Sequence, residues 1–171
     1  MKNIIFLDID GVLNCQSFYK KRSLSYTVKQ TEEEQYKEEI CQERMKWLNQ
    51  LCIDTDSSVV ISSSWRLGKE TKDLERILEY YGATFKIIGR TDYLNGIERG
   101  VEIRKWLDDN TKTLFNILAH NYYNYVIIDD DNDMLLSQRE HFFQTDNYSG
   151  LTPNICYSIG MFLNRNNRNS Y

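Results

Sequence analysis

The sequence has only one proline and eight glycines among its 171 residues, and no tract rich in proline, glycine or serine. Linkers between domains are usually built from such tracts, so we expect a single domain spanning residues 1–171. A chain of this length buries roughly 70% of the surface of its unfolded state, and it needs no disulfide or structural metal to be stable.

Histidine and cysteine are also scarce, at two and four residues. The cysteines are far apart in the chain and form no Cys-x-x-Cys pair: Cys15, Cys41, Cys52 and Cys156. This excludes the usual zinc-site patterns and favours the reduced thiols of a cytosolic protein.

Long hydrophobic runs are absent from the sequence, and none approaches the roughly 20 residues that a membrane-spanning helix needs. The first apolar run, residues 4–9, is too short for a signal peptide and contains an aspartate. We therefore expect a soluble, cytoplasmic protein. The formal net charge of -4 excludes a strongly basic coat for nucleic acid, but a local basic groove depends on the arrangement of charges rather than on their sum.

Short apolar runs predict buried strands at residues 4–9, 59–62, 84–88 and 125–128, with a weaker candidate at 141–145. Runs that are nearly continuously apolar are typical of strands covered on both faces, as in a parallel sheet.

Helical patterns lie between these strands. Thr31 and Glu34 have the spacing of a capping box, and apolar residues from Ile40 to Leu51 fall on one face of the helix that would follow. Further helices are expected at residues 69–81, from residue 99, and from Thr152-Pro153 to about residue 163. Alternating strands and helices indicate an α/β fold: a doubly wound, mainly parallel, Rossmann-like sheet with helices on both faces. Ligands of such sheets bind beyond the carboxyl ends of the strands, so the residues after each strand are the candidates for function.

Asp8 and Asp10 follow the first strand, and Gly11 allows the chain to turn away. Two carboxylates at alternate positions point the same way in extended backbone, and a divalent cation would offset their repulsion. The alternative is a solvated turn rich in aspartate and glycine.

Three serines and an arginine follow the second strand: Ser62, Ser63, Ser64 and Arg66. Hydroxyls and free backbone N–H groups at a strand-to-helix turn bind anions, and an arginine adds a bidentate grip on phosphate oxygens. The alternative is a helix cap followed by a packed tryptophan, Trp65.

An acidic cluster, with Asp129, Asp130 and Asp133 as candidate ligands, follows the fourth strand. So many carboxylates at one sheet edge repel each other without a cation, and oxygen-only ligands favour Mg²⁺ over zinc or copper. The glycine and final glutamate of a calcium-binding EF-hand loop are missing.

At these residues the sequence resembles the haloacid dehalogenase (HAD) superfamily of phosphotransferases. Asp8-Ile9-Asp10 resembles its first motif, Ser62 its second, and Asp129, Asp130 and Asp133 its acidic fourth. The Ser-Ser-Trp-Arg segment and residues 99–107 are similar to a small capless branch found in phage proteins and as a module of Swiss-army-knife RNA-repair proteins.

The resemblance implies a Mg²⁺-dependent phosphatase that forms an aspartyl-phosphate. Asp8 would attack phosphorus, and Asp10 would protonate the leaving oxygen and then deprotonate the attacking water. Ser62 would hydrogen-bond a phosphoryl oxygen.

The resemblance also implies a set of Mg²⁺ ligands. Asp129 would hold the ion together with Asp8 and the backbone carbonyl of Asp10, and Asp130 and Asp133 would support it directly or through water. The family's third motif is a lysine or arginine that steadies the nucleophile, but no Lys-Pro pair marks it here. Arg99 is the first candidate for this role and Lys105 the second.

No separate cap domain fits between Asp10 and Ser62 or between Ser62 and Asp129, so we expect an open site. An open site suits a terminal phosphate of single-stranded DNA or RNA better than a small metabolite.

Residues 15–30 are expected to form a flap loop beside this site. Aromatic residues alternate there with basic ones, which suits stacking on bases beside a phosphate track. The candidate substrate-binding residues are Lys20, Lys21 and Arg22, with Tyr19 and Tyr26 as aromatic partners. The alternative is a solvated flap with a few anchoring aromatic residues.

Two other functions stay open at this point. A small-molecule or nucleotide phosphatase would use the same chemistry on a different leaving group. A non-hydrolytic phosphate-binding or receiver-like module also accepts phosphate on an aspartate, although receivers place that aspartate after an inner strand of the chain, whereas Asp8 follows the first.

Overall fold

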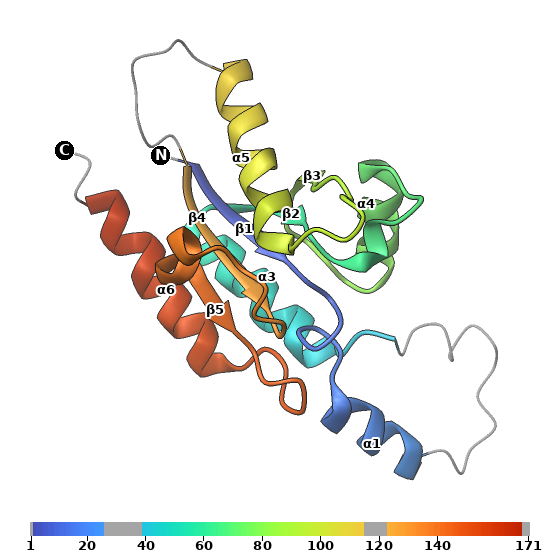
Figure 1. Ribbon diagram of the computed structural model, residues 1–171. Coiled ribbons are helices and arrows are strands. Elements are labelled where there is room, and N and C mark those ends of the chain that lie inside the picture. Colours follow the sequence, from blue (N-terminus) through green and yellow to red (C-terminus); the bar gives the residue numbers. More distant parts are fainter. Residues whose placement is uncertain (1, 26–38, 115–122, 169–171) are drawn as a thin grey trace.

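The protein, a computed structural model described over residues 2–25, 39–114 and 123–168, is built on one parallel sheet (Figure 1). The strands are β1 (Lys2–Leu7), β2 (Ser57–Ile61), β3 (Ile87–Arg90), β4 (Tyr123–Asp129) and β5 (Phe142–Gln144). Their order across the sheet is β3-β2-β1-β4-β5, and every neighbouring pair is parallel. The prediction of a doubly wound α/β fold is confirmed.

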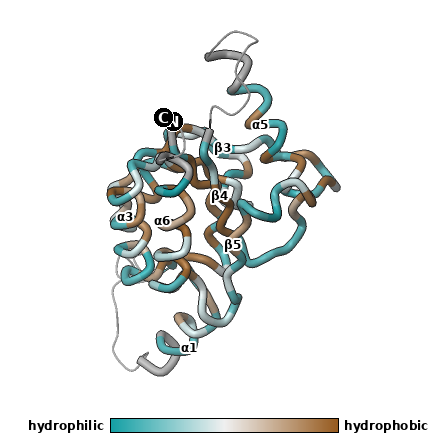
Figure 2. Tube along the Cα trace, turned by 90° about the vertical axis from the view of Figure 1, so that its left-hand side faces the viewer, coloured by the Kyte–Doolittle hydropathy of each residue, from teal (hydrophilic) through white to brown (hydrophobic). Residues whose placement is uncertain are grey.

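Helices cover both faces of this sheet (Figures 1 and 2). The covering helices are α3 (Gln42–Thr55), α4 (Thr71–Tyr80), α5 (Arg99–Leu114) and α6 (Pro153–Arg168). Helix α1 (Gln16–Ser25) extends away from the sheet (Figure 1), and two short 3-10 turns are η1 (Ser64–Arg66) and η2 (Leu136–His141). Within the described residues, no helix combines the length and apolar character needed to cross a bilayer.

The position of β1 at the centre of the sheet explains why this strand is apolar at nearly every position. Ile5 and Leu7 belong to the larger hydrophobic cluster, which includes residues of α3, α4 and α6. Ile4 and Phe6 belong to a smaller cluster with Ile103 of α5. Because alternate side chains point to opposite faces, a strand between two helical layers is buried throughout.

The segment expected to be a flap loop contains helix α1 instead. Its first turn is anchored to the loop after β5, because the N–H groups of Gln16 and Ser17 donate to the carbonyls of Asn147 and Tyr148 at 3.1 and 3.0 Å. No glycine or proline interrupts residues 16–25. The helix shows no apolar periodicity, so the sequence pattern gave no signal for it. The remainder of the expected flap, including Tyr26, lies outside the described residues.

The helix predicted to follow Thr31 does not run continuously through Ile40. Thr31 and Glu34 lie outside the described residues, but Cys41 has extended backbone (φ -69°, ψ 113°) and α3 begins only at Gln42. The Cys41 N–H donates to the carbonyl of Leu13 at 3.0 Å, which ties the chain to the turn after β1. This tertiary hydrogen bond sets the start of α3.

We predict that Leu48→Ala lowers the free energy of unfolding by about 2–5 kcal/mol, because Leu48 is fully buried between α3 and the sheet. Ile53→Ala on the same helix is the matched control, since Ile53 is 68% exposed, and it should change stability by less than about 0.5 kcal/mol. Chemical denaturation measures both. Equal losses would contradict this packing of α3.

Candidate active site at the carboxyl edge of the sheet

The hydrogen-bond ladder of the sheet continues one residue beyond β1, β2, β3 and β5. The Thr91 N–H donates to the last carbonyl of β2, and the Ser62 N–H donates to the last carbonyl of β1, both at 3.0 Å. The Asp8 N–H donates to the Ile128 carbonyl at 3.0 Å. The Thr145 N–H donates to the Asp129 carbonyl at 2.9 Å. These polar residues therefore form one row across the carboxyl edge. It is the edge at which α/β sheets bind ligands.

Strand alternation places the key side chains of this row on a single face. The residues two positions before Asp8, Ser62 and Asp129 all belong to the hydrophobic cluster beneath α5. Side chains two apart share a face, so the three polar side chains lie on the side covered by α5.

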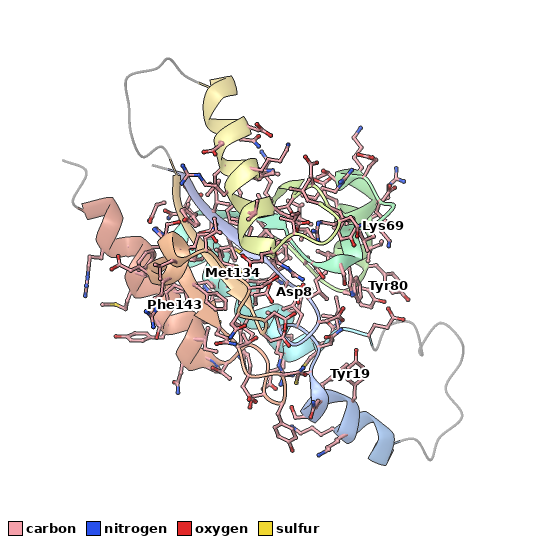
Figure 3. The ribbon with its side chains drawn as sticks, in the orientation of Figure 1. Asp8, Tyr19, Lys69, Tyr80, Met134 and Phe143 are labelled. Atoms are coloured by element: carbon pink, nitrogen blue, oxygen red, sulfur yellow. The ribbon has the colours of Figure 1, made fainter. Side chains whose placement is uncertain are left out.

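Arg99, the first residue of α5, reaches two of these acids. Its Nη1 lies 2.7 Å from Asp8 Oδ1 and 2.9 Å from Asp129 Oδ2. The Arg99 N–H donates to Asp133 Oδ2 at 3.0 Å, so Asp133 binds the exposed N–H at the start of the helix. Figure 3 shows Asp8 beside the first turn of α5.

Asp8, Asp129 and Asp130 form an acidic cluster. Each offers a carboxylate oxygen, and these atoms all lie within 4.8 Å of one another. Burial raises the pKa of Asp8, although Arg99 and the Ser63 hydroxyl favour its charged form. Burial and repulsion from Asp8 raise the pKa of Asp129 to about 8, against the attraction of Arg99. The single positive charge of Arg99 thus does not balance the negative charges of the cluster. A divalent cation that takes oxygen ligands fits this site.

Gly11 brings the turn after β1 against this cluster. Its φ is +73°, and a Cβ at this position would lie 2.2 Å from the Asp130 Cγ. The Gly11 carbonyl accepts a hydrogen bond from the Thr145 hydroxyl at 2.9 Å. Only glycine satisfies both the backbone angle and the close approach.

Asp10 lies outside the acidic cluster and is exposed. Its Oδ1 accepts a hydrogen bond from Asn14 Nδ2 at 2.8 Å, and its Oδ2 accepts one from Trp65 Nε1 at 3.1 Å. Its side chain is therefore directed toward η1.

The three serines after β2 have different environments. Ser62 is fully buried, and among the described residues its Oγ has no hydrogen-bond partner. Ser63 is also buried, and it accepts a hydrogen bond from the Trp65 N–H at 3.4 Å, whereas Ser64 is exposed. A buried hydroxyl without a partner is costly, so the position of Ser62 suits a group that binds a ligand.

Comparison with protein families gives a match to the HAD domain in Swiss Army Knife RNA repair proteins, over residues 4–155. The chain belongs to this family. The matched range includes the whole row of polar residues and the acidic cluster, so the resemblance inferred from the sequence is confirmed and indicates a phosphatase-like hydrolase. No curated protein and no solved structure gives a significant match.

Arg66 of this HAD domain is buried rather than directed to a phosphate. The five N–H donors of a guanidinium are all used here. They contact Glu102 and the backbone carbonyls of the four residues Ser62, Ser63, Thr91 and Asp92. The sequence suggested a phosphate ligand, but these contacts instead use Arg66 to hold the loops after β2 and β3 together.

Lys105, the second candidate for the third HAD motif, is 44% exposed on α5. Its Nζ lies 2.8 Å from Asp92 and 2.7 Å from Asp109. The structure thus brings Arg99, and not Lys105, to the acidic cluster.

Two of the basic candidates of α1, Lys20 and Lys21, are exposed, and Lys20 Nζ lies 5.0 Å from the ring centroid of Tyr148. Consecutive helical residues point about 100° apart, so these two lysines face different directions. Arg22 follows on the same helix, with its side chain outside the described part.

Sequence reasoning missed two residues of this HAD site. Thr91 is fully buried with an unpartnered Oγ1 among the described residues, but the third strand was expected to end at Ile88, three residues earlier. The indole of Trp65 was considered only as a packed ring, because a side-chain donor to Asp10 has no sequence signal.

We predict that Glu102→Gln destabilises the domain by about 3–5 kcal/mol, because it leaves the buried Arg66 without its counter-ion. Glu98→Gln is the control, since Glu98 is exposed just before α5. Thermal and chemical unfolding measure both variants. An unchanged stability for Glu102→Gln would show that Arg66 is not held by this pair.

Proposed function

We propose that this HAD domain is a Mg²⁺-dependent phosphomonoester hydrolase that works through an aspartyl-phosphate on Asp8. The observation that carries the proposal is the cluster of the buried Asp8 and Asp129 with the half-buried Asp130, beside Arg99. An anionic nucleophile approaches an anionic phosphate only where positive charge is already in place.

Asp8, Asp129 and Asp130 would hold the Mg²⁺, with the Asp10 carbonyl as the family resemblance implies. Their oxygen-only donors and close spacing fit that ion. When bound, Mg²⁺ supplies the positive charge that neutralises the nucleophile and the phosphate. Asp133 contributes indirectly, because it holds the N-terminus of α5 from which Arg99 extends.

In the first step, an Asp8 carboxylate oxygen bonds to phosphorus while the bond from phosphorus to the leaving oxygen breaks. Asp10 donates its proton to that oxygen. In the second step, water attacks the phosphorus of the aspartyl-phosphate, Asp10 takes the proton of the water, and the Asp8 carboxylate is released with inorganic phosphate. The exposed position of Asp10 leaves it accessible to both the leaving group and water.

Arg99 and Ser62 would bind the transferred phosphoryl group. Arg99 already lies against Asp8, and the unpartnered Ser62 Oγ lies in the adjacent position of the row. The N–H groups at the start of α5 add a favourable dipole.

We further propose that the substrate is a terminal phosphate of a nucleic acid. The family occurs in RNA repair proteins, and none of the described elements forms a separate domain over the strand ends. An open edge admits a polymer end.

Asp8→Asn should abolish turnover and preserve the fold, because an amide has nearly the same shape but is not a nucleophile. Phosphate release in Mg²⁺ measures the activity, and excess chelator should silence the parent protein as well. Circular dichroism controls for folding. More than a tenth of the parental rate in the variant would exclude Asp8 as the nucleophile.

A phosphorylated single-stranded oligonucleotide should have a higher kcat/KM than the matching mononucleotide, and the difference should shrink as salt rises. The double variant Lys20→Ala, Lys21→Ala should reduce the difference. The control variant Lys86→Ala, Arg165→Ala removes two exposed cations near the amino ends of the strands, and it should leave the difference in kcat/KM unchanged. If mononucleotides are hydrolysed equally well at low salt, the enzyme is a small-molecule phosphatase.

A further inference from the structure

A cavity of about 520 Å³ opens beside Asp10, on the side of that carboxylate that faces η1. Its walls come from separate parts of the chain: Glu39, Ser64, Trp65, Lys69, Ile77 and Tyr81. No member of the acidic cluster lines it, so it is distinct from the candidate Mg²⁺ and phosphate site. Its volume is typical of pockets that bind small molecules or single residues of a polymer.

Two aromatic rings form a fixed wall of this cavity. The centroids of Trp65 and Tyr81 lie 6.2 Å apart with an interplanar angle of 66°. The Trp65 indole is also held by its hydrogen bond to Asp10, and the Tyr81 hydroxyl donates to Glu39 at 3.0 Å. Tyr81 is only 6% exposed and supports the half-buried Trp65, whose ring forms a stacking surface that needs little ordering when a planar ligand binds.

Lys69 brings one positive charge to the same cavity. It follows η1, and its backbone N–H donates to the Arg66 carbonyl at 3.1 Å. Figure 3 shows Lys69 on the same side of the molecule as Tyr80, whose ring packs edge-on against Tyr81 at 5.3 Å. The cavity thus combines an aromatic wall with a cation, a combination that suits a nucleotide.

Asp10 connects this cavity to the reaction. A general acid must lie within hydrogen-bond reach of the leaving oxygen. Asp10 lines the cavity, so an alcohol that it protonates departs on this side, while the phosphoryl group stays with Asp8.

We infer that this cavity binds the leaving group of the reaction and that the leaving group is a nucleoside. Its base stacks against Trp65, whose ring Tyr81 supports, and Lys69 pairs with the phosphate of the next nucleotide when the nucleoside ends a strand. The inference rests on the proposed function, to which it adds the residues that select the substrate. A free mononucleotide and a strand end share the nucleoside but differ in the contact with Lys69.

Two substitutions of Trp65 separate its ring from its N–H donor. Trp65→Leu removes both, whereas Trp65→Phe keeps a ring and loses only the hydrogen bond to Asp10. The test compares kcat/KM for adenosine monophosphate, for the dinucleotide with the same terminal phosphate, and for ethyl phosphate, which has no ring. Trp65→Leu should cost the two nucleotides about tenfold more than ethyl phosphate. Trp65→Phe should restore most of this difference.

Lys69→Met should reduce the preference for the dinucleotide over the mononucleotide. The control Lys86→Met should leave this preference unchanged, because Lys86 is exposed just before β3, at the amino ends of the strands. If Trp65→Leu slows all substrates by the same factor, Trp65 only positions Asp10 and the inference is overturned. If Trp65→Leu fails to fold, a preference for the dinucleotide over the mononucleotide that is unchanged in Lys69→Met overturns it.

Binding of unphosphorylated adenosine distinguishes this inference from the proposed function. Adenosine should quench the tryptophan fluorescence of the parent protein, and Trp65→Phe should remove the quenching. If no phosphoester is hydrolysed but adenosine still quenches through Trp65, the proposed function fails and the nucleoside site stands. If the nucleotides and ethyl phosphate are hydrolysed equally well and adenosine does not bind, the hydrolase stands and the nucleoside site is wrong.

Discussion

Asp8 and Asp129 are buried side by side at the ends of neighbouring strands, and the repulsion between their carboxylates constrains everything around them. The protein offsets part of this repulsion with Arg99, whose position depends on the start of α5. That start is itself held by the loop after β4, through Asp133 and through Gln138, whose Nε2 donates to the Gly100 carbonyl at 2.8 Å. The segment after β4, which supplies Asp130, therefore also positions the arginine that opposes the acidic cluster.

Two arginines near this edge, the half-buried Arg99 and the buried Arg66, have opposite roles. Arg99 turns toward the acidic cluster, and attraction to Asp129 and Asp8 raises its pKa although burial alone would lower it. Arg66 turns away and pairs with Glu102, whose other oxygen accepts the Leu94 N–H at 2.7 Å. One arginine is thus available to an anion, and the other fixes the loops that frame the site.

The fold and the acids of the site could be predicted from the sequence because both depend on local patterns. A short apolar run followed directly by Asp8 or Asp129 marks a strand end in any parallel sheet, and the sheet geometry then brings these ends together. Side-chain direction has no such pattern. The sequence could not tell that Arg66 points inward, since its acceptors lie on the loops after β2 and β3 and on α5, up to 36 residues away along the chain.

Elements whose boundaries depend on tertiary contacts were also beyond the sequence. The start of α3 depends on a hydrogen bond from Cys41 to Leu13, and the first turn of α1 is held by hydrogen bonds to the loop after β5. The cavity beside Asp10 is assembled from separate chain segments, so no single motif indicates it.

Asp10 stands apart from the other acids, and this separation has a chemical reason. A carboxylate inside the cluster would compete for the cation and could not exchange a proton with the leaving group or with water. Asn14 and Trp65 instead hold Asp10 outside it, at the boundary between the buried acids and the aromatic cavity. Asp10 is therefore accessible from the solvent and from the cavity, the two sides from which water and a leaving group would reach it.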